Sequence, residues 1–339
     1  MKKLVYKSSV ILLLLALCLG VYIYHQIFSS LTKSDKIILV PTGTSYNELK
    51  DTLRSNNLLN NEVVFDVFCS KKNYKTIYPG RYLVNSHMDL NSLLNMLRLG
   101  AQKPLNIIFN NTSTIYDLAG KLSYQIEADS IDLLEAFRNE LFYSTYDFDE
   151  ASIRKLFIPN TYEFYWNISV ENFISRLIKE YSAFWNKNRI RKAKEIGLTK
   201  KEVSILASIV EKEQNIKIDE RKIIAGLYLN RIRRNMKLES DPTLVFAIGD
   251  FSIKRVLNKD KKINSKYNTY KYKGLPPGPI CIPSINSIDA VLNAANHNYI
   301  FMCAKEDFSG YHNFAKTYKQ HLKNARKYQK ALNKRNIMR

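Results

Sequence analysis

An uncharged and strongly apolar stretch near the N-terminus constrains this chain more than any other feature. It runs from Ser8 to Thr32, and its centre, Val10 to Ile27, consists mostly of Leu, Ile and Val. A helix needs about 20 apolar residues to cross the hydrocarbon core of a bilayer. A core helix of a soluble protein would be unusual at this length and position. We therefore predict a membrane-spanning helix at residues 8–30.

The charges that flank this stretch predict its orientation. Positive flanks stay in the cytoplasm, and three cationic residues precede the stretch, namely Lys2, Lys3 and Lys7. Residues 1–7 are thus predicted to be cytoplasmic, with the body of the chain extracytoplasmic and anchored in the inner (cytoplasmic) membrane. Tyr22 and Tyr24, near the far end, suit a membrane–water interface.

Removal of the stretch by a signal peptidase is the alternative. A cleavable signal peptide has a shorter apolar region that ends in small residues. Here the apolar run continues beyond Gly20 without an A-x-A site. A lipoprotein signal would use Cys18, but Leu17 before it is not small. We therefore expect an uncleaved anchor that contacts the lipid bilayer.

A formal net charge of +21 also requires an explanation. Lys and Arg clustered in a nucleic-acid-binding motif would indicate phosphate binding, but here they are spread along the whole chain without such a motif. No nucleic-acid partner is expected, and the predicted anchor and topology conflict with one. A solvated basic surface and attraction to an acidic polymer or to anionic lipid head groups both stay open.

The cysteines predict neither a metal site nor a disulfide framework. No two have the short spacing of a structural zinc site, and three remain outside the apolar stretch: the four are Cys18, Cys69, Cys281 and Cys303. No metal and no cofactor is expected.

The segment after the anchor predicts a small α+β module at residues 36–103. Ile38 to Val40 suits a strand, and a polar turn then precedes a helix with Leu49 and Leu53 on one face. The layout recurs about 69 residues later. This internal repeat predicts scaffolding or the gripping of a linear polymer.

The second copy is predicted at about residues 104–128. The strand Ile107 to Phe109 and the polar turn 110–113 precede a helix that carries Leu118 and Leu122. Farther on the apolar spacing is mostly helical. We predict an α+β protein whose residues 104–339 form a mainly helical domain with short strands.

Between two predicted helices of that domain lies an irregular aromatic segment, Leu156 to Trp166. It could line a carbohydrate groove, because sugar faces stack on aromatic rings, or be buried as core. Both interpretations stay open.

The helix predicted at residues 199–213 is the most informative for chemistry. Thr199 with Glu202 fits a capping box, and an apolar run then ends in Glu211 and Glu213. Burial disfavours a charged carboxylate, so a glutamate against apolar walls can stay protonated near neutral pH and act as an acid. Two glutamates that simply end a helix are the ordinary alternative.

Helix geometry does not decide between the two glutamates. Ser204, Ser208 and Glu211 share one edge of small residues, which would give substrate room to approach Glu211. Glu213 falls on roughly the opposite side, among Leu206 to Ile209, so burial favours it. The choice stays open at this point.

Downstream motifs supply candidate substrate contacts. Ser240 to Thr243 is a turn and helix-start signal. The segment Tyr267 to Tyr270 and the stiff, proline-rich loop 274–280 follow. His312 is a candidate contact, although a plain polar turn residue is the commoner case.

Together these stretches resemble the MltG/YceG-like family of endolytic murein transglycosylases, and the resemblance covers essentially the whole chain. Ala207 to Glu213 is similar to the family's catalytic helix. The other matching segments occur in the family's order and spacing: Leu229 to Arg231, Leu238 with Ser240 to Thr243, Tyr267 to Tyr270, Gly274 to Gly278, and His312 with Phe314. The resemblance implies that residues 36–103 are a LysM-like module and that residues 104–339 form the YceG-like catalytic domain.

The same resemblance implies a function and a site. The first glutamate of the motif, Glu211, would protonate the glycosidic oxygen between N-acetylmuramic acid and N-acetylglucosamine, and would then accept the proton of the muramic C6 hydroxyl. Nascent peptidoglycan strands would end in 1,6-anhydro sugars, as part of cell-wall synthesis and strand termination, with cell-wall synthases as candidate partners. Substrate-binding roles are predicted for Asp241, Asn268, Tyr270, Ser208 and His312.

A different class of protein would also fit the anchor and the small modules. A non-enzymatic, membrane-anchored scaffold that binds peptidoglycan would contact the cell wall without forming anhydro products.

Overall fold

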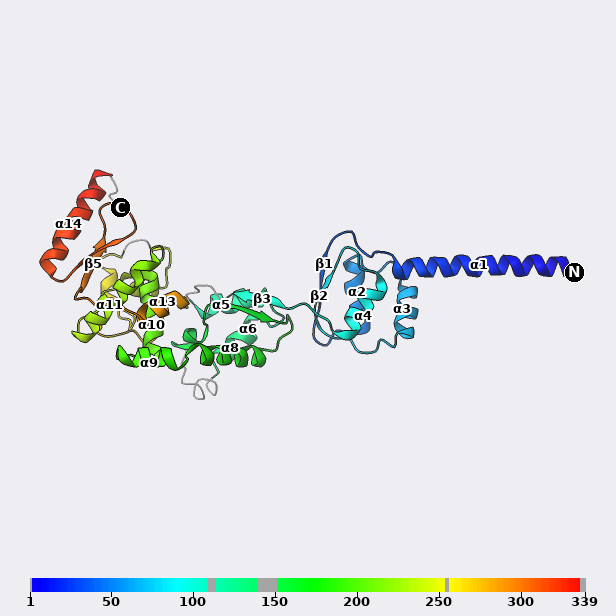
Figure 1. Cartoon of the computed structure of the whole chain (residues 1–339), viewed down its shortest axis with the longest axis horizontal. Helices are drawn as coiled ribbons and strands as arrows, with labels where there is room; N and C mark the ends of the chain where they lie inside the picture. Colours follow the sequence, from blue (N-terminus) through cyan, green and yellow to red (C-terminus); the bar gives the residue numbers. More distant parts are fainter. Residues whose placement is uncertain (1, 109–113, 140–150, 254–255, 336–339) are drawn as a thin grey trace. The chain divides into compact units, whose positions relative to one another are not determined.

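The computed structural model describes residues 2–108, 114–139, 151–253 and 256–335, and helices predominate over short strands within them (Figure 1). The chain divides into two compact units. The first comprises residues 1–107, 123–128 and 162–169, and the second comprises residues 108–122, 129–161 and 170–339. The predicted mixture of many helices with few short strands is confirmed.

The first helix, α1 (Lys2–Phe28), is the predicted apolar element. From Tyr6 to Phe28 it is long and apolar enough to cross a membrane, and none of that stretch is buried by the rest of the chain. Its far end is held to the first unit. Ile27 packs against the core of that unit, and Leu31 N donates to Met88 O at 3.0 Å.

The first unit pairs β1 (Lys36–Val40) with β2 (Gly80–Val84) in antiparallel register, Lys36 opposite Val84. Because side chains alternate along a strand, one face of this sheet is apolar and buried. Its core joins that face to three helices, whose bounds are α2 (Tyr46–Ser55), α3 (Glu62–Lys71) and α4 (Leu90–Leu99).

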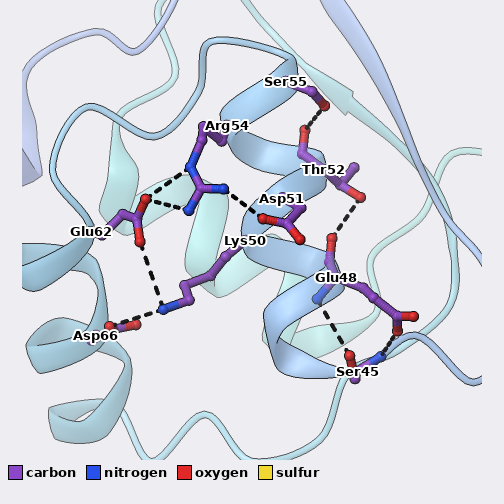
Figure 2. Close-up of polar contacts among 9 residues, drawn as sticks. All are labelled: Ser45, Glu48, Lys50, Asp51, Thr52, Arg54, Ser55, Glu62 and Asp66. Atoms are coloured by element: carbon purple, nitrogen blue, oxygen red, sulfur yellow. Dashed lines mark hydrogen bonds and ion pairs between the residues drawn. The ribbon is translucent and has the colours of Figure 1, made fainter.

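Helix α2 begins on a local signal. Ser45 forms a capping box with Glu48, in which Ser45 N donates to the Glu48 carboxylate at 2.7 Å (Figure 2). The predicted inward residues Leu49 and Leu53 are fully buried. The helix therefore forms where cap and apolar spacing coincide.

A strand and a helix lie where the second repeat was predicted. β3 (Leu105–Ile108) pairs with β4 (Thr161–Phe164), and α5 (Ile115–Ser123) buries Leu118 and Leu122. The predicted turn at 110–113, together with Phe109, lies outside the described residues. The aromatic segment is core only in part, because Leu156 to Ile158, Tyr162 and Phe164 are buried whereas Tyr165 is exposed.

The second unit is built around α10 (Lys200–Glu213). Helices α9 (Lys187–Glu195), α11 (Arg221–Arg233), α12 (Asp241–Ile248) and α13 (Ile285–Leu292) pack against it. The remaining elements are α6 (Ser130–Phe137), α8 (Val170–Phe184), α14 (Tyr318–Lys334), the antiparallel pair β5 (Phe301–Ala304) and β6 (His312–Ala315), and the short 3-10 turns η1 (Ile153–Leu156), η2 (Ile218–Glu220) and η3 (Asp260–Lys262).

Candidate active site

Helix α10 carries both candidate acids at its C-terminal end. The predicted capping box is present: Thr199 N donates to the Glu202 carboxylate at 2.8 Å, and Glu202 N donates to Thr199 Oγ1 at 3.2 Å. Every residue from Val203 to Glu211 is buried, so packing holds the helix on all sides. The C-terminal end of a helix also disfavours an ionised carboxylate.

Glu213 ends α10, and its carboxyl is enclosed by groups from two other elements. Glu213 Oε1 accepts hydrogen bonds from the hydroxyl of Tyr228 on α11, at 2.7 Å, and from the hydroxyl of Ser240 before α12. Burial raises the pKa of the Glu213 carboxyl more than these hydrogen bonds lower it, and nearby Asp241 raises it further. The arrangement favours a protonated acid.

Glu211 lies one half-turn earlier in a different setting. It is 6% exposed, and Glu211 Oε2 accepts a hydrogen bond from Ser284 N at 2.6 Å. Ser284 is the N-cap of α13, and Arg221 donates to its hydroxyl at 3.1 Å. A carboxylate at this position stabilises the start of α13.

Two cavities meet at Glu213. The first, of about 440 Å³, is lined largely by apolar and aromatic side chains, among them Val245, Phe246 and Phe251. The second, of about 400 Å³, is lined by more polar groups that include Tyr270 and His312. Glu213 and Asp241 line both cavities, whereas Glu211 lines neither.

Asp241 and Tyr270 form a hydrogen-bonded pair beside Glu213. The Tyr270 hydroxyl donates to Asp241 Oδ1 at 2.6 Å. Burial and then this hydrogen bond raise the pKa of Tyr270, so its hydroxyl stays protonated. Asp241 occupies the first turn of α12, where a carboxylate is stabilised by the helix dipole. The structure thus brings two predicted binding residues together at the cavities.

The edge of α10 that carries Ser204 and Ser208 is covered, so the predicted open edge beside Glu211 is wrong. Both side chains are at most 1% exposed. Ser208 Oγ donates to Ile205 O at 2.7 Å and accepts from Ile280 N at 3.0 Å. Ser208 therefore fastens the proline-rich loop to α10 and lies in neither cavity.

Asn268 is buried inside its own loop. Its side-chain amide donates to Lys261 O and Ile263 O, at 3.0 and 2.8 Å, and its carbonyl oxygen accepts from Tyr270 N at 3.0 Å. These contacts use the carboxamide to shape the loop that presents Tyr270. Asn268 therefore acts on the cavities through Tyr270, and a direct sugar contact remains only a prediction.

His312 faces the second cavity and is held from behind. Its Nδ1 lies 2.7 Å from Glu220 Oε2, and its backbone N donates to Glu220 Oε1 at 2.8 Å. Burial alone would raise the pKa of Glu220, but hydrogen bonds from His312 and Gln214 hold it below its ordinary value. The carboxylate thereby orients the imidazole toward the cavity.

Three residues of this site were not among the predicted ones: Tyr228, Ser240 and Glu220. Tyr228 and Ser240 lie 15 and 27 residues from the glutamate that they contact. No helical or strand spacing links such positions. Ser240 belonged to a recognised motif, which was the only available signal.

Comparisons with known proteins add a family and relatives. A model of the YceG-like family matches residues 38–327. The chain is 28% identical over 315 residues to an endolytic murein transglycosylase of Bacillus subtilis, covering 88% of this chain and 86% of that protein.

Two further comparisons differ in how much they cover. An endolytic murein transglycosylase of Streptococcus pneumoniae is 27% identical over 322 residues, covering 84% of this chain but 58% of that longer protein. The crystal structure of a YceG-like protein of Listeria monocytogenes aligns with a TM-score of 0.56 at 24% identity. It covers 86% of this chain and 99% of that one, and it supports the fold.

Proposed function

This chain belongs to the YceG-like family, and we propose from that premise that it is an endolytic murein transglycosylase, a lyase that cuts peptidoglycan glycan strands. Relatives that carry this name match most of the chain. The acid at the junction of two cavities is the structural observation that supports the activity best.

We assign the catalytic acid to Glu213 rather than to Glu211. The Glu213 carboxyl lies at both cavities, and burial raises its pKa above the ordinary value, which favours the protonated form that a general acid needs. Glu211 instead accepts a backbone hydrogen bond at the start of α13. The family resemblance had favoured Glu211, so an experiment must separate the two.

The proposed reaction uses one carboxyl twice. Protonated Glu213 gives its proton to the glycosidic oxygen that links C1 of N-acetylmuramic acid to N-acetylglucosamine, and the bond at C1 breaks. The muramic C6 hydroxyl then attacks C1, and the Glu213 carboxylate accepts its proton. Ordinary glycosidases need a second carboxylate for water or for a covalent intermediate, whereas an internal hydroxyl removes that need.

The cavities would hold sugars on either side of the bond that breaks. Aromatic walls such as Phe246 and Phe251 suit the faces of sugar rings, whereas Tyr270 and His312 offer hydrogen bonds to hydroxyl or amide groups. Asp241, shared by both cavities, would position the sugar next to Glu213 and favour a developing positive charge at C1.

The anchor, the small module and the partners of the chain complete the proposal. Helix α1 would anchor the chain in the inner membrane with residues 1–7 in the cytoplasm, as Lys2, Lys3 and Lys7 suggest. The module at residues 36–103, LysM-like in the resemblance, would hold glycan near the catalytic domain at 104–339. Cell-wall synthases are the proposed partners.

A matched pair of variants tests the assignment. Purified full-length chain in detergent is incubated with peptidoglycan, and mass spectrometry counts anhydro-ended fragments. Glu213→Gln should lose about 10²–10⁴-fold in rate, the usual contribution of a general acid, and remain folded. Glu211→Gln should cleave at a rate close to that of the unmodified chain but unfold at a lower temperature.

The opposite pattern would return the role to Glu211. Anhydro products at full rate from both variants would refute a catalytic carboxyl on α10. A chain that binds peptidoglycan but forms no anhydro product in any version would instead be the non-enzymatic scaffold.

A further inference from the structure

A groove separates the outer end of α1 from α3. It encloses about 340 Å³ and is almost wholly apolar. Four α1 residues that share one face of the helix line it, namely Leu19, Tyr22, Ile23 and Ile27. From α3 come Val63, Val64, Val67 and Phe68. Four of the ten residues that line this groove therefore belong to the predicted membrane span itself.

Helix α3 exposes apolar side chains on one face, although its acidic side chains form ion pairs. Val63 is 72% exposed and Val67 is 53% exposed. They lie one turn apart, so they form one stripe. Exposed valines are ordinary singly, but a stripe continuous with a groove marks an interaction surface.

The acidic face of α3 turns the other way, toward α2. Glu62 pairs with Arg54, and Asp66 lies 3.1 Å from Lys50 Nζ (Figure 2). These pairs neutralise the charges of α3 that anionic lipid would repel. Lys71, for which the described residues show no ion pair, also lines the groove.

The position of α1 in a bilayer fixes the depth of the groove. Residues Tyr6 to Phe28 would extend about 34 Å as a helix, slightly more than a hydrocarbon core of about 30 Å. Leu19 lies about 13 Å before the end of that span. The groove thus begins at acyl-chain depth and ends at the headgroup level, the zone in which amphipathic interfacial helices lie.

The geometry points to a second membrane contact: α3 lies in the outer leaflet beside α1, with acyl chains of phospholipid filling the groove. This inference rests on α1 being a membrane span and goes beyond the proposed reaction. We expect phospholipid in the groove because the groove is continuous with the surface of α1. Lipid that surrounds Leu19 and Ile23 also reaches Val63 and Val67. The Lys71 ammonium would reach up to lipid phosphates.

A second protein helix fits the groove less well. A helix is a rigid rod about 10 Å wide, whereas the groove, of about 340 Å³, is bounded by only ten residues. Flexible acyl chains conform to such a space. An interfacial α3 would hold the first unit against the membrane and restrict its tilt about α1.

Tryptophan quenching by brominated phosphatidylcholine tests the contact. The full-length chain is reconstituted in vesicles with bromines near either the headgroup end or the methyl end of the acyl chains. Val63→Trp is compared with Leu99→Trp, because Leu99 is also 72% exposed but ends α4, whose first residue, Leu90, lies beside Gln26 of α1. Leu17→Trp, at the centre of α1, reports the anchor. The unmodified chain supplies the background of the native tryptophans.

We expect headgroup-end bromines to abolish the added emission of Val63→Trp and to leave that of Leu99→Trp unchanged. Val63→Trp emission that survives while Leu17→Trp is quenched by methyl-end bromines would overturn this inference alone. Leu17→Trp emission that survives would overturn the membrane span, and this inference with it. Val63→Trp emission that is protected from the bromines, even when each vesicle holds very few protein copies, would mean that protein rather than lipid covers the groove.

Discussion

The hydrogen bond from Tyr228 to Glu213 makes a quantitative prediction about the pH dependence of cleavage. The Tyr228 hydroxyl donates to Glu213 Oε1 at 2.7 Å, and the ring is almost fully buried. Tyr228→Phe removes this donor and leaves the ring packed. The donor stabilises the carboxylate more than the neutral acid, so its loss raises the pKa of Glu213 further.

The size of the effect follows from the kind of hydrogen bond. A bond to a charged group contributes about 1.5–3 kcal/mol, and about 1.4 kcal/mol corresponds to one pH unit. Glu213 must be protonated to begin the reaction, so activity falls as pH rises through its pKa. The alkaline limb of the pH–rate profile should therefore move upward by about one to two pH units in Tyr228→Phe.

The assay is the initial rate of anhydro-product release from peptidoglycan across a pH series. Tyr82→Phe is the matched control, because Tyr82 is also buried and donates to a backbone carbonyl, Tyr78 O, at 2.8 Å. Tyr82→Phe should lower the free energy of unfolding by a comparable amount and leave the pH–rate profile of cleavage unchanged. An alkaline limb that stays in place in Tyr228→Phe would refute Glu213 as the titrating acid.

Two further predictions concern stability. A Cβ at Gly226 would lie 2.3 Å from Ala295 O, so Gly226→Ala should destabilise the fold by about 1–3 kcal/mol and lower the unfolding temperature by several degrees. A Cβ at Gly120 would meet open space within a helix, so Gly120→Ala should raise the free energy of unfolding by about 1 kcal/mol. Calorimetry that finds Gly226→Ala more stable than Gly120→Ala would contradict the close packing around Gly226. The pKa of Glu220 is lower in the folded chain than its ordinary value of about 4.3. Its pairing with His312 therefore stabilises the fold at pH values above the ordinary pKa. That stability is lost as the pH falls through the lowered pKa of the folded chain. The difference in melting temperature between the unmodified chain and Glu220→Gln should therefore shrink in acid, and a difference independent of pH would argue against the pair.

Local patterns in the sequence determined much of the architecture. The apolar length of α1, the cap at Thr199, and the buried positions Leu49 and Leu53 could all be predicted. Each depends on residues within one or two helical turns, so the spacing along the chain carries the information. The motifs also narrowed the acid to two glutamates on one helix.

The tertiary structure alone decided how those glutamates differ. Burial and pKa depend on atoms brought from distant positions: Tyr228 and Ser240 enclose Glu213, whereas Ser284 engages Glu211. Helix periodicity located a small-residue edge at Ser208 but could not show that a loop some 70 residues later would cover it. The sequence by itself therefore specified the helix and its two acids, and only the packing of other elements around that helix determined which carboxyl meets the cavities.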